Sequence, residues 1–77
     1  MADYHVEALE LARNGDWEAS HRLIQAHGDR LACLIHAYLH RVEGDDWNAR
    51  YWYSRAGEPM PDNRLEEELE RLSNLAE

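Results

Sequence analysis

The sequence predicts an all-α protein, and three observations lead to this prediction. Apolar residues recur at the helical period along most of the 77 residues. Short breaks separate these segments at an even spacing, because Gly15-Asp16 recurs as Gly44-Asp45 29 residues later. No stretch alternates β-branched with polar residues, and threonine is absent. We therefore expect a single domain, residues 1–77, of two stacked antiparallel helical hairpins and a C-terminal closing helix.

The first hairpin is expected over residues 3–27. Its first helix covers about residues 3–13 and carries one apolar face, made of Tyr4, Ala8, Leu11 and Ala12. The "NGD" break at 14–16 ends this helix, and Asp16 is a suitable N-cap for a second helix to about residue 26. The "HGD" break at 27–29 ends the second helix.

The second hairpin is expected over residues 29–57. Asp29 caps a helix over about 30–43, which has the apolar residues Leu31, Leu34, Ile35, Tyr38 and Val42 at the helical period. The "EGDD" break precedes a fourth helix over about 46–56. Gly57, followed by two prolines, ends that helix.

The closing helix is expected over residues 62–76, with Asp62 or Asn63 as its N-cap. Four residues form an apolar stripe along it: Leu65, Leu69, Leu72 and Ala76. The acidic residues are expected on the outer side of this helix, with Arg64–Glu68 and Glu67–Arg71 as i,i+4 pairs.

Residues 33–61 resemble a tetratricopeptide-type hairpin. The later half of that pattern is met by Ala49, Tyr53 and Pro61, with the Gly44-Asp45 turn in place. The first half departs from the pattern, since Cys33 replaces tryptophan and two histidines replace leucine and tyrosine. The resemblance implies tetratricopeptide-like stacking.

Residues 36–57, "HAYLHRVEGDDWNARYWYSRAG", also resemble a segment of a family of small uncharacterised bacterial proteins. The similar string runs His-Ala-Tyr-Leu-His-Arg-x-Glu-Gly-Asp-x-x-Asn-Ala-x-Tyr-Trp-Tyr-x-Arg-Ala-Gly. This resemblance implies a bacterial source and a helical fold, and it assigns no activity.

Charge and composition exclude several classes of function. The formal charge is −8, and every cation is an arginine. We expect neither nucleic acid nor membrane as a partner, because both require a cationic face. Without lysine, a Walker phosphate loop and Schiff-base chemistry are excluded, and no cofactor is expected. A single cysteine, Cys33, an acidic start and a longest apolar run of five residues favour a cytoplasmic location.

The histidines of the third helix allow two interpretations. In the favoured one, small residues bring the third and fourth helices close together, and buried, hydrogen-bonded rings line that seam: His36, His40, Trp52 and Tyr53. In the alternative, His36, His40 and Glu43 form a metal- or ligand-binding helix face, because histidines at i and i+4 can share one ion. Further donors would then have to come from His21, His27 or an acid elsewhere.

The fourth helix carries the candidate interaction surface, made of Trp47, Arg50, Tyr51 and Arg55. Tryptophan, tyrosine and arginine are the residues that most often anchor protein interfaces. In the alternative, Trp47 and Tyr51 pack under the leucines of the closing helix. We expect a protein–protein interaction module with an unidentified protein partner. A homodimer is a further alternative, and no serine or cysteine constellation favours an enzyme.

Overall fold

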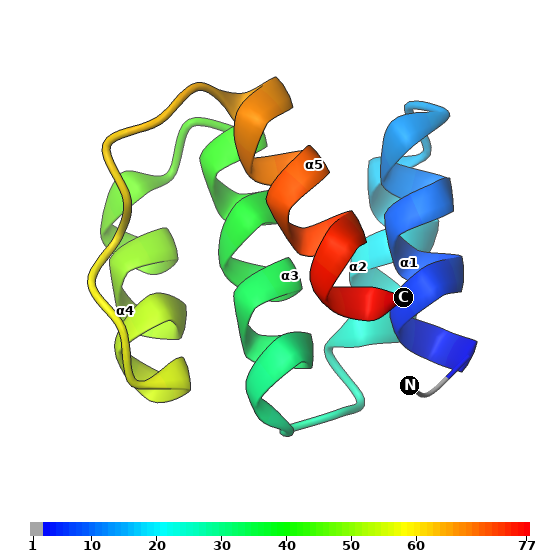
Figure 1. The fold of residues 1–77 in the computed structure, drawn as a ribbon, viewed down its shortest axis with the longest axis horizontal. Helices are drawn as coiled ribbons and strands as arrows, with labels where there is room; N and C mark the ends of the chain where they lie inside the picture. The colour runs from blue at the N-terminus through cyan, green and yellow to red at the C-terminus, as the bar shows by residue number, and fades with distance from the viewer. Residues whose placement is uncertain (1–2) are drawn as a thin grey trace.

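The computed structural model describes residues 3–77 and contains five α-helices within them (Figure 1). In chain order these are α1 (Asp3–Arg13), α2 (Trp17–Ile24), α3 (Arg30–Val42), α4 (Asp46–Ala56) and α5 (Leu65–Ala76). The described chain has no strand, which confirms the all-α class. Helices α1 and α2 pair as one hairpin, α3 and α4 pair as the second, and α5 packs across α3 and α1.

Helix α3 is the centre of the molecule, because it contacts each of the other four helices. Every residue from 32 to 40 is buried, including two histidines. A helix that is covered on all sides needs side chains that are apolar, small or hydrogen-bonded around its whole circumference. The α3 sequence meets this requirement, because its buried residues are apolar or small, apart from Tyr38 and the two histidines, whose rings contact other side chains.

Small residues allow the helices of each hairpin to approach closely. In the first hairpin, the fully buried Ser20 hydroxyl of α2 donates a hydrogen bond of 2.7 Å to the Ala8 carbonyl of α1. In the second hairpin, Ala37 of α3 and Ala49 of α4 are both completely buried. Small buried residues thus occur on both helices of the α3–α4 pair.

The sequence repeat of 29 residues is a repeat of one turn geometry. Gly15 and Gly44 have φ angles of 83° and 85°, a left-handed conformation that glycine adopts without steric cost. The following aspartates have nearly equal backbone angles, and each caps the next helix: Asp16 accepts from the Ala19 amide and Asp45 from the Asn48 amide, both at 3.2 Å. The same local sequence thus produces the same chain reversal in both hairpins.

Helix α5 begins at Leu65, three residues later than expected, because Asn63 has another role. The Asn63 side chain accepts a hydrogen bond from Arg41 at 2.9 Å and donates one to Glu68, also at 2.9 Å. It is therefore not used as a cap. Instead, the Glu67 side chain accepts a 2.8 Å hydrogen bond from the Arg64 amide and holds the first turn.

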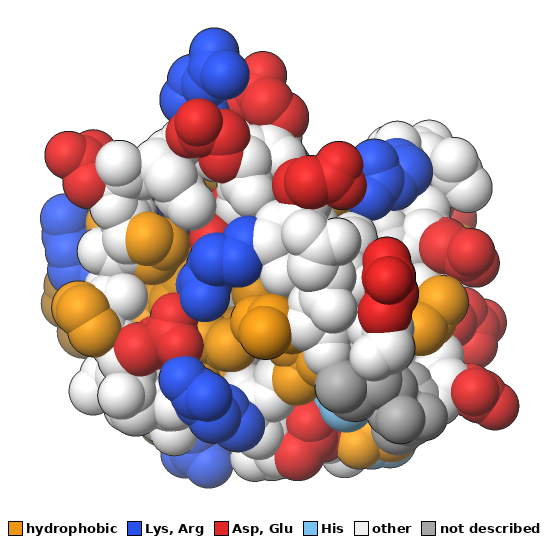
Figure 2. Space-filling view, viewed as in Figure 1, with side chains coloured by type: hydrophobic (Ala, Val, Ile, Leu, Met, Phe, Trp, Pro, Cys, Tyr) orange, Lys and Arg blue, Asp and Glu red, His pale blue; other side chains and the backbone are white. Residues whose placement is uncertain are grey.

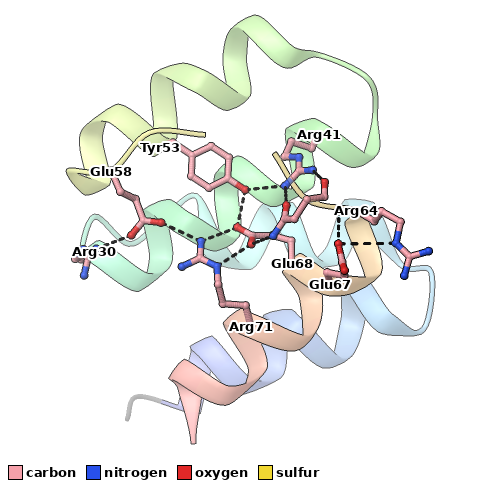
Figure 3. A network of polar contacts seen from close by, with 9 residues as sticks. Arg30, Arg41, Tyr53, Glu58, Arg64, Glu67, Glu68 and Arg71 are labelled. Atoms are coloured by element: carbon pink, nitrogen blue, oxygen red, sulfur yellow. Dashed lines mark hydrogen bonds and ion pairs between the residues drawn. The ribbon is translucent and has the colours of Figure 1, made fainter. Parts of the chain in front are cut away.

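A buried carboxylate joins α5 to the second hairpin (Figure 3). Glu68 has no exposed surface, and it accepts hydrogen bonds from the Tyr53 hydroxyl at 2.7 Å, from Asn63, and from Arg71 through two nitrogens at 2.8 Å each. Burial alone would raise the pKa of Glu68, but these donors lower it below its usual range. Arg71 also reaches Glu58, which in turn pairs with Arg30.

This network corrects the expectation for the closing helix. Glu68 was expected on the outer side in a pair with Arg64, but it lies on the inner side and pairs with Arg71 at i,i+3. Glu68 is three residues after Leu65 and four before Leu72, so it lies within the apolar stripe. This spacing could have indicated from the sequence that Glu68 is buried. A charged residue within such a stripe requires buried partners from elsewhere in the chain.

The surface over α5 and the 57–64 segment mixes both signs of charge (Figure 2). Arginine and acidic side chains lie beside one another there, and the apolar patches between them are small. Among residues 3–77, no helix combines the length and the apolar character that crossing a lipid bilayer requires.

Asp29 joins the two hairpins and leads to a pH prediction. It accepts hydrogen bonds from the Tyr4 hydroxyl and the His5 ring, both at 2.6 Å, and from the Ala32 amide at 3.1 Å. Partial burial alone would raise the pKa of Asp29, but these hydrogen bonds lower it to about 2. A carboxyl group with a lowered pKa stabilises the fold above its unfolded pKa of about 4, and this contribution is lost as the pH falls toward 2.

We expect Asp29→Asn to be less stable than the wild type at pH 6 by about 1 kcal/mol, allowing for solvent screening at a partly exposed group. The two proteins should converge in stability between pH 4 and pH 2, as measured by urea unfolding at each pH. The amide oxygen of the Asp29→Asn variant would still accept the cap hydrogen bond, so the helix itself should persist. The control is Asp16→Asn, at a cap with one amide donor among the described residues. An equal pH dependence for both variants would contradict the role of Tyr4 and His5.

Candidate functional site

Three histidines meet where α2 crosses α3. His36 and His40 lie one turn apart on α3, and His21 reaches them from α2. The Nε2 atoms of His21 and His36 are 3.1 Å apart, and one ligand atom from each of the three rings lies within 4.8 Å of the others. We call these residues the histidine cluster; it joins the first hairpin to the second.

Glu43 orients one ring of the cluster. The His40 Nδ1 atom lies 2.6 Å from the Glu43 carboxylate, on the last turn of α3. A carboxylate accepts hydrogen bonds, so Nδ1 carries the proton, and Nε2 is left with its lone pair when the ring is neutral. The pairing therefore sets which nitrogen of His40 can bind an ion.

His36 is the most enclosed member of the cluster. The residue is 5% exposed, and its Nδ1 atom is buried without a hydrogen-bond partner among the described residues. Burial, together with the nearby His21 and His40, lowers the pKa of His36 to about 4. Burial also lowers the pKa of His21. Both rings are therefore neutral at pH 7, with one nitrogen lone pair each.

Two tryptophans enclose the cluster. The Trp52 ring of α4 stacks on His36, with ring centroids 3.9 Å apart and planes 15° apart. The Trp17 ring stacks on His21 at 4.7 Å and 8°, and the Trp17 indole nitrogen donates a 2.7 Å hydrogen bond to the Leu39 carbonyl. These contacts restrict the rotation of both imidazole rings.

The structure brings together part of the set expected from the sequence. His36 and Trp52 meet at the seam between α3 and α4, whereas His40 lies beside Trp17 and His21 of α2. The Tyr53 hydroxyl contacts Glu68 and Arg41 instead. For the metal alternative, Glu43 does not complete a three-ligand group with both histidines of α3; it groups with His40 and Asp45. His21 takes the third position, and its place depends on how α2 crosses α3.

His5 and His27 lie away from this cluster. His5 is buried and bonded to Asp29, and its Nδ1 atom lacks a partner within the described chain. The His27 ring stacks on Tyr4, with centroids 3.5 Å apart. Neither residue groups with the cluster, so of the two additional donors considered from the sequence, His21 and His27, one contributes.

The outer face of α4 is the second candidate site. Trp47 is 79% exposed and Tyr51 is 46% exposed. Within the part of the chain that is described, α4 has backbone contacts with no helix other than α3, so these rings do not pack under the α5 leucines. That alternative is wrong, because residues 57–64 run back along α4 and then cross to the place where α5 packs on α3 and α1 (Figure 1).

Arginines order this face. The Arg55 guanidinium lies 5.3 Å from the Trp52 ring centroid and 5.9 Å from that of Tyr51, within range of a cation–π interaction. Arg55 also donates a 3.2 Å hydrogen bond to the Tyr51 hydroxyl. Arg50 is exposed beside an open hollow of about 700 Å³ between α4 and residues 57–62. We call Trp47, Arg50, Tyr51 and Arg55 the aromatic–arginine face.

Comparison of the chain with protein-family models, with curated protein sequences and with solved structures finds no match.

Proposed function

We propose that the protein is a protein–protein interaction module, and that the aromatic–arginine face of α4 binds a partner segment bearing acidic and apolar side chains. The observation that carries this proposal is the exposure of Trp47. A tryptophan ring that is 79% exposed contributes little to the core, while its burial by a partner would remove a large apolar area from water.

The other three residues give the face its specificity. Tyr51 is held by Arg55, so part of the face is ordered before a partner arrives, which lowers the entropy cost of binding. Arg50 and Arg55 are exposed cations on a chain whose net charge is −8. They would attract carboxylates of a partner, and the remaining acidic surface would repel partners that lack complementary charge.

The position of α4 in the stack supports the same proposal. In stacked hairpins each unit buries its outer helix under the next unit, and the last unit requires a cap. Here α5 turns back across α3 and α1, so no further helix covers α4, although residues 57–62 run beside it. A partner helix would therefore occupy the place of a further repeat, in keeping with the tetratricopeptide-like arrangement that we also propose.

Site-specific crosslinking tests this function. With a photoreactive phenylalanine analogue in place of Trp47, we expect a discrete crosslinked product whose mapped partner peptide is rich in Asp and Glu. The double variant Arg50→Glu, Arg55→Glu should reduce the yield at least tenfold, because two attractions become repulsions. The matched control is Arg22→Glu, at an exposed position of α2, which should leave the yield unchanged.

The outcomes separate the possible partners. A crosslink to a second copy of the chain would identify a homodimer, which equilibrium sedimentation would confirm. No discrete product, or a product equally reduced by Arg22→Glu, would contradict the proposal. Circular dichroism of each variant verifies that the helices are retained.

We further propose a location in the bacterial cytoplasm. Cys33 is buried as a free thiol, which is in keeping with a reducing compartment. The bacterial source rests on the resemblance of residues 36–57.

A further inference from the structure

We propose that the histidine cluster binds one divalent transition-metal ion through His21, His36 and His40 and leaves one coordination position open. This inference does not depend on the proposed function of the aromatic–arginine face, because the three histidines belong to α2 and α3. It rests on the convergence of three imidazoles from two helices, on their spacing, and on the groups that hold them.

The spacing fits a metal ion. Two nitrogens bound to one tetrahedral zinc ion, each 2.0–2.1 Å from it, are about 3.3 Å apart. The Nε2 atoms of His21 and His36 are 3.1 Å apart, and the third ring offers a nitrogen within 4.8 Å of both. For the three nitrogens to form one face of a tetrahedron around the ion, the His40 ring would have to move closer to the other two.

The surrounding groups match those of known metal sites. A metal-bound histidine commonly donates its other ring N–H to a carboxylate, which fixes the tautomer and makes the ligand nitrogen more basic. His40 and Glu43 have this arrangement, with 2.6 Å between Nδ1 and the carboxylate. The stacking of Trp17 on His21 and of Trp52 on His36 holds the other two rings in place.

The donor set indicates the class of ion. Imidazole nitrogens suit zinc, copper, nickel and cobalt, whereas magnesium and calcium prefer oxygen. Three protein ligands leave a fourth position for water or another small ligand, as in catalytic rather than structural zinc sites. His21 is only half-buried, so an ion can reach the cluster from solvent. Glu43 and Asp45, both near His40, would offset part of the charge of the ion.

A hydrogen bond between two neutral rings also explains a 3.1 Å distance, but it accounts for fewer of the observations. One bond between His21 and His36 does not require the third ring or the pairing of that ring with Glu43. The buried Nδ1 atom of His36 does not separate the two explanations, because both use its Nε2 atom. The two explanations differ in a measurable way, because one of them requires the ion.

The test uses the full chain, purified without a histidine tag and freed of metal with a chelator. Isothermal titration with Zn²⁺ or Co²⁺ should show one ion per chain, and Co²⁺ should give the intense visible absorption of a tetrahedral site. NMR should show shifts of the ring protons of His21, His36 and His40, and not of His5 and His27. Melting temperature should rise on adding Zn²⁺.

Variants identify the ligands. We expect His21→Gln to weaken Zn²⁺ binding at least a hundredfold, and Glu43→Gln to weaken it tenfold to a hundredfold. His27→Gln, at a histidine outside the cluster, is the matched control and should bind as the wild type does. His21 is half-buried, so its variant should fold; the melting temperature without metal verifies this. If His21→Gln fails to fold, the ring-proton shifts of the wild type decide the question alone. No saturable binding, or equal losses for His21→Gln and His27→Gln, would overturn the proposal.

Discussion

Replacing Glu68 by alanine is expected to lower the free energy of unfolding by about 3–5 kcal/mol, the range seen when one partner of a buried ion pair is removed. The carboxylate is fully buried and accepts from Arg71, Asn63 and Tyr53. Its removal leaves the Tyr53 hydroxyl without its acceptor and a guanidinium without its principal partner (Figure 3). Since the network joins α5 to the second hairpin, α5 should detach first.

Urea unfolding followed by circular dichroism measures this loss, and hydrogen exchange locates it. The matched control is Glu70→Ala on the exposed side of α5, for which we expect a change within about 0.5 kcal/mol. Glu68→Gln retains the shape but not the charge, so it should lie between the two. A Glu68→Ala protein as stable as the Glu70→Ala protein would show that the network does not hold α5.

The variant Ile35→Ala is expected to lose about 2–5 kcal/mol, through lost apolar burial and the cavity that remains. Ile35 is completely buried on α3, the helix that contacts all the others, so no single neighbour can move to fill the space. A 77-residue domain has a total stability of about 4–12 kcal/mol. The change therefore removes a large part of it.

Thermal and urea unfolding check the Ile35 prediction. Val42→Ala is the matched control, since it removes methyl groups from the same helix at a position that is 44% exposed. We expect it to lose less than about 1 kcal/mol. Similar losses for both variants would mean that the centre of α3 is loosely packed.

The helices and their turns follow closely from the sequence, because the signals that specify them are local. Asp16, Asp29 and Asp45 cap the helices that they were expected to cap. Helices α1 and α4 have the expected bounds, and α2 and α3 differ by one or two residues at their ends. The start of α5 was misplaced, because Asn63 is drawn into contacts with Arg41 and Glu68 from distant parts of the chain.

The candidate sites were predicted less completely. The helical period placed His36 beside His40 and grouped Trp47 with Tyr51, since residues three or four apart share a face. It did not distinguish whether those aromatic rings were covered, which depended on the path of residues 57–64. In the metal-binding alternative, Glu43 was the third ligand, whereas Glu43 orients His40 and the third ring of the cluster is His21, 15 residues before His36.

Local sequence signals were thus sufficient to predict the five helices, the two matching turns and the face of each helix on which most side chains lie. Helix packing alone determined that His21 meets His36, that Glu68 is buried and that Trp47 stays exposed. The physical reason is that periodicity and capping act within a few residues, whereas these three outcomes depend on how helices from different parts of the chain cross.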